Sequence, residues 1–286
     1  MAMTASSGVA QGAGSATPAG QAERSPFLRT TELLAPYQPA KPLITLSLGE
    51  PQHPVPDFVG PVLAKHIADF GRYPLAKGIE PFRRSVANWL STRFDLPRAV
   101  DPESEVLVLN GSREGLFFAA ITAARYVGPR RGKPAILMPN PFYPAYGAGA
   151  RASGCESIYL PTTLANGFLP DLDALDEATL ARTVAIFIAS PANPQGAVAS
   201  REYFTRLKKL ADHYGFMILS DECYSEIYTR QAPGSALECA GPDFTNVVAF
   251  QSLSKRSNLP GMRVGFAAGD RKFLAAFHEF RNVAAP

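Results

Sequence analysis

The feature that most constrains the fold of this chain is a regular alternation between short apolar runs and segments with helical spacing. The predicted strands are Val106 to Leu109, Ala135 to Met138, Ser157 to Leu160, Val184 to Ala189, Phe216 to Leu219 and Val247 to Phe250. Most are separated by segments such as SREGLFFAAITAARY and REYFTRLKKLADHY, whose apolar residues recur with a helical period. Strands covered on both faces form continuous apolar runs. The alternation therefore predicts an α/β domain with a mostly parallel sheet.

Composition and charge exclude several classes of protein. With 286 residues, 46% of them hydrophobic and 19% charged, the chain can form a large core. A formal net charge of +3 without a basic tract argues against a nucleic-acid or membrane surface. No apolar stretch approaches the roughly 20 residues of a membrane helix. We therefore expect small molecules or another copy of the chain as partners.

Further predictions concern the redox compartment, metal binding and the N-terminal segment. Three cysteines without paired spacing predict free thiols in a reducing compartment, hence a cytoplasmic location, and four scattered histidines indicate no metal site. Residues 1–24 lack the basic start and apolar segment of a signal peptide, and we predict a disordered tail. After it, KPLITLSLGEPQHPVPDF predicts a short strand and a proline-rich turn, and FVGPVLAKHIADF predicts a helix.

The residues that follow each predicted strand are candidates for a binding site, because ligands of open α/β sheets bind beyond the carboxyl ends of the strands. The segments that follow five of these strands are NGSREG, PNPFYPAY, SPANPQG, SDECY and QSLSKR. They contain a helix-opening Gly-Ser pair, two aromatic residues, an Asn-Pro turn, an aspartate with a tyrosine, and a lysine. We predict that these distant segments form one site.

Two ionisable residues follow buried strands and need partners there. Burial and the neighbouring cations Arg256 and Arg263 would favour the neutral, nucleophilic amine of Lys255. Asp221 follows FMIL, and a protonated ring nitrogen of a cofactor could be the partner of its carboxylate. The alternatives are a solvated surface amine for Lys255 and a helix N-cap, opening ECYSEIY, for Asp221.

An anion site is predicted where a helix opens directly after the strand that ends at Leu109. Free backbone N–H groups and the helix dipole attract an anion at such a position. Residues of a second segment could complete a phosphate site. The candidates from both segments are Gly111, Ser112, Arg113, Ser252, Ser254 and Arg263. Helix capping is the alternative explanation of the Gly-Ser pair.

A lysine, an aspartate for a ring nitrogen, a phosphate site and a stacking aromatic residue are the groups that hold pyridoxal phosphate. SPANPQG, SDECYSEIY and SLSKRSNLPGMRVGF, with their spacing, resemble the signature segments of the fold-type I pyridoxal-phosphate aminotransferases, class I/II. The resemblance runs from about Lys41 to the chain end. Within the family, SLSKRSNLPG together with NGSREGLF and PNPFYPAY most resembles the succinyldiaminopimelate aminotransferases of bacterial lysine biosynthesis.

The resemblance implies a role for each residue of the site. Lys255 would form the Schiff base and move protons, Asp221 would pair with the pyridine nitrogen, and Tyr143 would stack on the ring. Tyr224 and Asn193 would bind the cofactor's 3-hydroxyl. The phosphate would be held by Ser112, Arg113, Ser252, Ser254 and Arg263.

Two residues outside these segments also match the family. Tyr73, in GRYPLAKG, matches a tyrosine that reaches the phosphate of the neighbouring subunit, which implies a homodimer with shared sites. Gly49, in SLGEP, matches a backbone contact to the substrate carboxylate, and Asn193 would also contact the substrate. For Tyr143 and Tyr73, a core or interface aromatic residue is the alternative.

The implied reaction moves an amino group from an amino acid, expected to be N-succinyl-LL-2,6-diaminopimelate, to an oxo acid such as 2-oxoglutarate. The implied fold is a three-layer αβα large domain over residues 61–286, with residues 25–60 as an N-terminal arm and part of a small domain. In the family a C-terminal part of the small domain supplies an arginine for the substrate carboxylate. We expect this part to be absent here, as in a truncated chain.

Three alternatives stay open. The same fold hosts carbon–sulfur lyases, decarboxylating enzymes and aspartate- or alanine-type aminotransferases. GAGARA, Gly147 to Ala152, fits the G-x-G-x-x-A dinucleotide pattern, although PFYPAY and not a strand precedes it. The third alternative is a chain that binds the cofactor or a partner without turnover.

Overall fold

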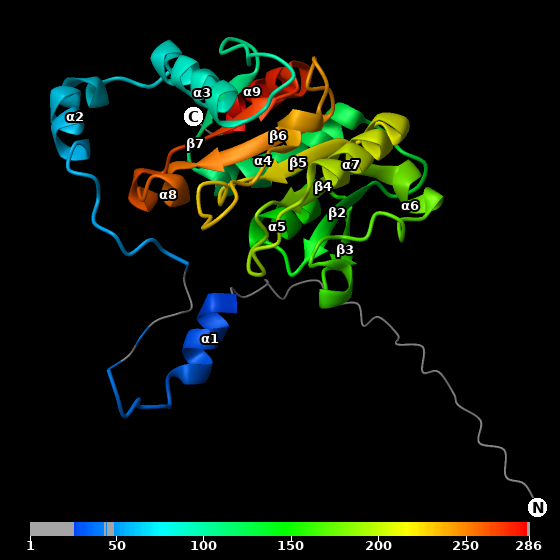
Figure 1. Ribbon diagram of the computed structural model, residues 1–286, viewed down its shortest axis with the longest axis horizontal. Coiled ribbons are helices and arrows are strands. Elements are labelled where there is room, and N and C mark those ends of the chain that lie inside the picture. The colour runs from blue at the N-terminus through cyan, green and yellow to red at the C-terminus, as the bar shows by residue number, and fades with distance from the viewer. Residues whose placement is uncertain (1–25, 43, 45–48, 285–286) are drawn as a thin grey trace, which may run out of the picture. The chain divides into compact units, whose positions relative to one another are not determined.

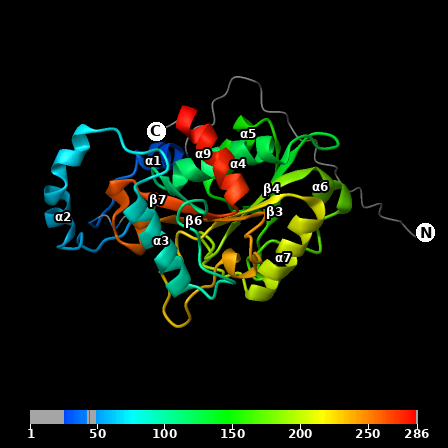
Figure 2. The same cartoon turned by 90° about the horizontal axis from the view of Figure 1, so that it is seen from above.

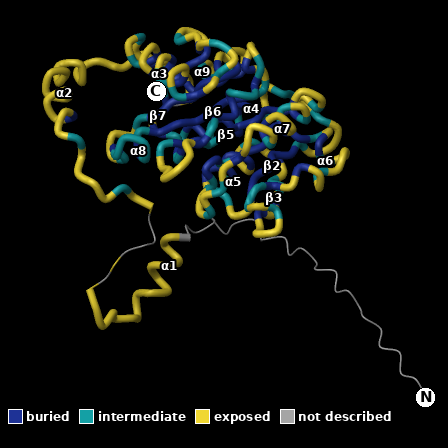
Figure 3. Tube along the Cα trace, viewed as in Figure 1, coloured by how far each residue is buried: buried dark blue, intermediate teal, exposed yellow. Residues whose placement is uncertain are grey.

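The structure, a computed structural model, describes residues 26–42, 44 and 49–284. The predicted tail and most of the strand expected within KPLITLSL lie outside these residues. The chain divides into two compact units, residues 1–49 and 50–286. In the first unit, the helix α1 (Pro26–Leu34) exposes its side chains from residue 27 onward (Figure 3).

The second unit is built around a seven-stranded sheet in the order β1-β7-β6-β5-β4-β2-β3 (Figure 1). Its strands are β1 (Val106–Leu109), β2 (Ala135–Asn140), β3 (Glu156–Pro161), β4 (Thr183–Ala189), β5 (Met217–Asp221), β6 (Val247–Ser252) and β7 (Gly265–Gly269). β7 is antiparallel to its neighbours β1 and β6, and the other pairs are parallel. The carboxyl ends of the six other strands therefore lie at one edge of the sheet.

The six predicted strands are confirmed, with ends that shift by two residues or fewer. β7, with the sequence GFAAG, was not predicted, because glycine and alanine are depleted in strands. It is fully buried between β1 and β6, where a side chain at either of its terminal glycines would clash with the backbone of β6. A Cβ on Gly265 would lie 2.6 Å from the Gln251 carbonyl oxygen of β6.

Helices cover both faces of the sheet, which confirms the three-layer arrangement (Figure 2). One face carries α4 (Ser112–Val127), α5 (Pro144–Ala152) and α9 (Arg271–Ala284), and the other carries α3 (Glu80–Arg93) and α7 (Arg201–Tyr214). In β5, Ile218 packs into the core with α3 and α7, whereas Leu219 packs into the core with α4, α5 and α9. The alternation of side chains along a strand thus supplies both cores.

Some of the helices begin and end at capping residues, whereas α3, α4 and α5 begin without a side-chain cap. α7 is the clearest case: the Ser200 hydroxyl accepts the backbone N–H of Tyr203, and Gly215 ends the helix in the left-handed conformation. Phe204 and Leu207 lie on its buried face at helical spacing. The sequence therefore predicts this helix from its first residue to its last.

The shorter helical elements are α2 (Val59–Lys65), α6 (Glu177–Arg182) and α8 (Leu253–Arg256), and the 3₁₀ turns Ile67–Gly71, Leu164–Asn166, Ala236–Cys239 and Pro260–Met262. The helix predicted across FVGPVLAKHIADF is found as α2 and the first of these turns. Within the described part of the chain, no helix is both long and apolar enough to cross a membrane.

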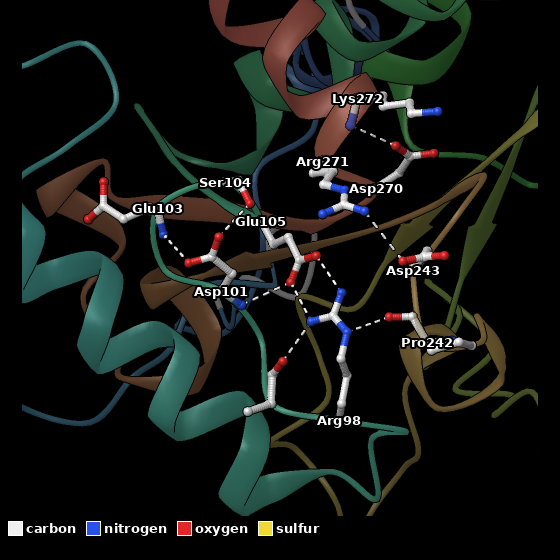
Figure 4. A network of polar contacts seen from close by, with 11 residues as sticks. Arg98, Asp101, Glu103, Ser104, Glu105, Pro242, Asp243, Asp270, Arg271 and Lys272 are labelled. Atoms are coloured by element: carbon white, nitrogen blue, oxygen red, sulfur yellow. Dashed lines mark hydrogen bonds and ion pairs between the residues drawn. The ribbon is translucent and has the colours of Figure 1, made fainter.

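A network of charged residues closes the sheet edge where β1 and β6 begin (Figure 4). Arg98 binds both carboxylate oxygens of buried Glu105, at 2.5 and 2.8 Å, directly before β1. Asp270 accepts the backbone N–H groups of residues 272 and 273 and so begins α9. Arg271 pairs with Asp243 at 3.4 Å. These residues join the ends of strands and the start of a helix, on the edge opposite the candidate site.

The GAGARA segment lies inside α5 and forms no phosphate-binding turn. A Cβ on Gly149 would lie 2.7 Å from the Phe117 carbonyl oxygen and 2.8 Å from the Ala120 Cβ, both on α4. Gly149 is therefore needed for the close packing of α5 on α4, and the dinucleotide alternative is not supported.

Candidate active site

The segments that were predicted to form one site follow strands whose carboxyl ends share an edge of the sheet. In the register of the central strands, Asp221 of β5 lies opposite Ala189 of β4 and Phe250 of β6. β4 and β5 therefore end level with each other, and β6 ends two residues further along. β7 runs in the opposite direction, so Arg263, which precedes it, comes to the same edge.

Asp221 is the last residue of β5, and its carboxylate is held by a tyrosine from α5. Tyr146 Oη donates to Asp221 Oδ2 at 2.6 Å, and the backbone N–H of Cys223 donates to Oδ1 at 3.3 Å. The ring of Tyr146 stacks on Phe187 of β4, with centroids 4.3 Å apart and planes within 5°. The carboxylate is thus fixed in direction by a rigid, buried aromatic pair.

The surroundings of Asp221 disfavour its negative charge. Burial raises the pKa of the Asp221 carboxyl above its usual value, although the hydrogen bond from Tyr146 acts in the opposite direction. Burial, followed by the charge of Asp221, also raises the pKa of the Cys223 thiol well above its usual value. A cationic partner would relieve the cost of ionising this carboxylate, and a protonated ring nitrogen is such a partner.

The N-cap alternative for Asp221 is wrong. β5 ends at Asp221, and residues 222–235 form turns and bends without a helix. The carboxylate instead accepts bonds from Tyr146 and from the turn at Cys223.

Lys255 lies on α8, the single turn that follows β6. The Ser252 hydroxyl accepts the backbone N–H of Ser254 at 3.1 Å and so begins this turn. The half-buried Lys255 has its Nζ 5.9 Å from the ring centroid of Tyr224. Asn193 Nδ2 in turn lies 3.5 Å from Tyr224 Oη. The structure therefore links the loops after β4, β5 and β6.

Arg256 was expected to flank the Lys255 amine, and the structure shows a different contact. Its guanidinium lies 4.5 Å from the ring centroid of Trp89 on α3. Burial lowers the pKa of Arg256 below its usual value. Packing against an aromatic face accommodates this partly desolvated cation.

The predicted anion site is built at the first turn of α4. Gly111 precedes this helix with φ of 83°, and a Cβ there would overlap the guanidinium of Arg263. A Cβ on Gly265 would lie 3.2 Å from the backbone nitrogen of Ser112. Two glycines therefore allow an arginine and the start of β7 to approach the backbone N–H groups at the start of α4, an arrangement that fits a phosphate.

The other predicted phosphate ligands already contact each other or their neighbours. Ser252 Oγ donates to Ser254 Oγ at 2.9 Å, and both side chains are buried. Arg113 Nε donates to Tyr143 Oη at 2.6 Å, and its guanidinium lies 5.7 Å from that ring. Tyr143 is the residue before α5, with its ring 5.8 Å from Tyr146 in an edge-on arrangement. Arg113 and Tyr143 thus join the loops after β1 and β2.

Tyr73 and Gly49 are not placed with this group. The Tyr73 side chain is 97% exposed, and Gly49 belongs to the first compact unit. Their assigned contacts stay predictions.

Sequence reasoning missed two residues of the site region. Tyr146 could have been recognised as a second tyrosine three residues after Tyr143, inside the helix that Tyr143 precedes. Glu222 is fully buried, and its Oε1 accepts the Ser220 and Ser235 hydroxyls at 2.9 and 3.0 Å and the backbone N–H of Ala236 at 2.9 Å. Burial raises the pKa of Glu222 to about 7. This carboxyl anchors the chain that follows Asp221.

Comparison with known proteins identifies a family model and relatives that resemble this chain. Residues 41–285 match the family described as aminotransferase class I and II. An LL-diaminopimelate aminotransferase of Desulforudis audaxviator is 38% identical over 260 residues, which cover 90% of this chain and 64% of that protein. A protein of the same name from Aquifex aeolicus is 35% identical and is covered over 60% of its length. The chain thus spans about three fifths of the length of these curated relatives.

Solved structures of aminotransferases have a fold similar to that of this chain. An aminotransferase of Neisseria meningitidis aligns with a TM-score of 0.84 at 37% identity, over 93% of this chain and 68% of that one. A probable N-succinyldiaminopimelate aminotransferase of Thermus thermophilus aligns with a TM-score of 0.75 at 30% identity, over 84% of this chain and 63% of that one.

Proposed function

The chain belongs to the aminotransferase class I and II family, and from this membership we propose that its site transfers an amino group between an amino acid and a 2-oxo acid. The family depends on pyridoxal phosphate. The observation that carries the proposal is the Asp221 carboxylate, oriented by Tyr146 at 2.6 Å, at the end of the strand next to the one that leads into Lys255.

The residues present fit this cofactor. When bound, pyridoxal phosphate supplies an aldehyde that takes up amino groups and a ring that accepts electrons. Asp221 would hold the ring N–H and keep it protonated, because its own ionised form gains a cation in apolar surroundings. The first turn of α4 and Arg263 would bind the phosphate, and Tyr143 would lie against the ring.

Lys255 would act as the base and acid at the substrate α-carbon. Its amine lies near the face of Tyr224, on the turn that Ser252 begins. An amine held in position in this way can serve as a general base and acid. Tyr224 and Asn193, whose polar atoms are 3.5 Å apart, would orient the hydroxyl side of the ring. These roles use side chains that follow the ends of β4, β5 and β6.

The amino donor is proposed to be a diaminopimelate, in a reaction of lysine biosynthesis with 2-oxoglutarate as the acceptor. The segments near the cofactor favour the N-succinyl-LL form, and the Thermus neighbour is named for it. The relatives from Desulforudis and Aquifex are named for LL-diaminopimelate itself. Initial rates with each donor, in separate assays with the same oxo acid, distinguish the two.

A homodimer in the cytoplasm is also part of the proposal. Its support is a run of exposed apolar side chains in the second unit, on and beside α2: Phe58, Val62, Ile67, Phe70, Tyr73 and Leu75. Such a surface is typical of a protein contact. In the homodimer that the family resemblance implies, the partner's Tyr73 would reach a phosphate site, and sedimentation of the chain at several concentrations tests the association.

Replacement of Lys255 tests the proposed function. With added pyridoxal phosphate, the unaltered chain should develop a visible absorbance band that bleaches when an amino donor is added. Lys255→Ala should lack the band and all turnover, whereas Lys272→Ala, on the exposed side of α9, should keep both. Turnover by Lys255→Ala would contradict the assignment. A lysine-dependent band with pyruvate formed in the absence of an oxo acid would favour the lyase alternative.

A further inference from the structure

An ion pair between Arg281 and Glu114 lies next to the predicted anion site, because Glu114 is in the first turn of α4. None of the roles proposed above uses this pair. Arg281, on α9, has a side chain only 3% exposed, and its Nη2 lies 2.7 Å from Glu114 Oε1 on α4. Its Nη1 donates to the carbonyl oxygen of Val108 in β1 at 2.8 Å. α9 packs on α4 over the same face of the sheet (Figure 2). A single buried cation therefore joins β1, α4 and α9.

Glu114 turns back over the start of its own helix. It is the third residue of α4, and its Oε1 also accepts the backbone N–H of Asn110, at 3.0 Å, in the turn that precedes the helix. This contact fixes the turn from Asn110 to Arg113, in which Gly111 and Ser112 meet Arg263 and β7. Glu114 Oε2 is buried without a hydrogen-bond donor, so its charge depends on Arg281 for compensation.

A carboxylate at this position has two opposite effects. It stabilises the first turn of α4, because a negative charge interacts favourably with a helix N-terminus. It also repels any other anion that binds to the same N–H groups, over a distance of about one helical turn. Arg281 resolves the conflict, since it cancels the charge of Glu114 and leaves its oxygen in place as the acceptor for Asn110.

We propose that Arg281 is a positioning residue for the phosphate site: through Glu114 it shapes the turn Asn110–Arg113 and neutralises the carboxylate that would otherwise repel the phosphate. This inference rests on the proposed function, which places the phosphate of the cofactor at this turn. It assigns a task in cofactor binding to α9, which supplies none of the predicted ligands.

The test compares charge variants of the pair by their affinity for inorganic phosphate and for pyridoxal phosphate, with pyridoxal as the ligand that lacks the phosphate. Arg281→Met should weaken phosphate binding by about tenfold, or about 1.4 kcal/mol, because it leaves a like charge about one helical turn from the phosphate. Glu114→Gln keeps the oxygen that accepts from Asn110 and removes the charge, so it should tighten phosphate binding by about threefold. The double variant should return to near the unaltered affinity.

A matched control separates this role from general stabilisation. Arg98→Met breaks another pair with a buried partner, at the opposite edge of the sheet, and should lower the melting temperature without changing phosphate affinity (Figure 4). Pyridoxal affinity should stay constant in all variants.

Each outcome bears on one of the two proposals. Unchanged or weaker phosphate binding by Glu114→Gln, which retains the turn, would overturn the inference even if Arg281→Met failed to fold. Failure of Glu114→Gln to rescue a folded Arg281→Met would also overturn it. If the unaltered chain bound neither phosphate nor pyridoxal phosphate, the proposed function would fall, and the inference with it.

Discussion

Removal of the Tyr146 hydroxyl isolates the contact that orients Asp221. Tyr146→Phe keeps the ring that stacks on Phe187 at 4.3 Å and deletes only the donor 2.6 Å from Asp221 Oδ2. Tyr146 is 1% exposed, so water cannot replace the lost hydroxyl without a rearrangement. The variant should therefore fold, and its unfolding free energy should fall by the contribution of one hydrogen bond.

The size of that loss depends on the charge of Asp221. A hydrogen bond to a charged group contributes about 1.5–3 kcal/mol to stability, whereas a neutral one contributes about 0.5–1.5 kcal/mol. The pKa of Asp221 in the folded chain is raised above its usual value of 3.8. Protonation of Asp221 therefore contributes its full stabilisation below pH 3.8, and this contribution is lost as the pH rises through the folded-state pKa. Without Tyr146 the folded pKa rises further, because a bond that favoured the carboxylate is gone. The destabilisation by Tyr146→Phe should therefore grow with pH.

Urea unfolding of both proteins at pH 5 and pH 8 measures this difference. We expect the loss of unfolding free energy to be larger at pH 8 than at pH 5, within the range of about 0.5–3 kcal/mol that neutral and charged hydrogen bonds span. Tyr203→Phe is the control, because Tyr203 Oη donates at 3.0 Å to a neutral carbonyl, that of Pro170. Its loss should be about 1 kcal/mol at both values of pH. If Tyr146→Phe behaved like this control, Asp221 would not be an ionised partner of Tyr146, and its fit to a ring nitrogen would lose its support.

Two other predictions concern buried residues outside the proposed catalytic groups. Glu222 has a folded pKa of about 7, so the stability from its protonation is complete below pH 4.5 and is lost as pH rises through about 7. Between pH 5 and pH 8, the unfolding free energy of the unaltered chain should therefore fall by about 2 kcal/mol more than that of Glu222→Gln, as measured by urea unfolding. An equal fall in both proteins would contradict the titration of a buried Glu222. Gly149→Ala should lower the unfolding free energy by about 1–3 kcal/mol, because its Cβ would lie 2.7 Å from the Phe117 carbonyl oxygen. Gly60→Ala, in α2, whose Cβ would meet no atom within 4 Å, separates this clash from the general effect of replacing a helical glycine, and an equal loss in both variants would remove the clash as the cause.

The alternation of apolar runs was sufficient to predict the layers of the fold, since periodicity along the chain directly reports which faces are covered. It did not predict β7, because GFAAG has the composition of a weak strand. Small residues there are required by the neighbouring backbone of β6, and that distance exists only after β6 and β7 pair. Arg256 shows the same limit: its neighbour in sequence is Lys255, but its contact is Trp89, on a helix far back in the chain.

The sequence alone determined which residues end the strands and so which segments could share a site, because the edge of a parallel sheet collects the residues after each strand. It also determined the family, through the spacing of segments around Asn193, Asp221 and Lys255. Only the tertiary structure decided what holds those residues in place: Tyr146 on Asp221, and Arg281 with Glu114 beneath the phosphate turn. These partners come from other elements at unrelated positions in the chain, and the energy of a buried hydrogen bond or ion pair depends on distance and burial, which no local pattern encodes.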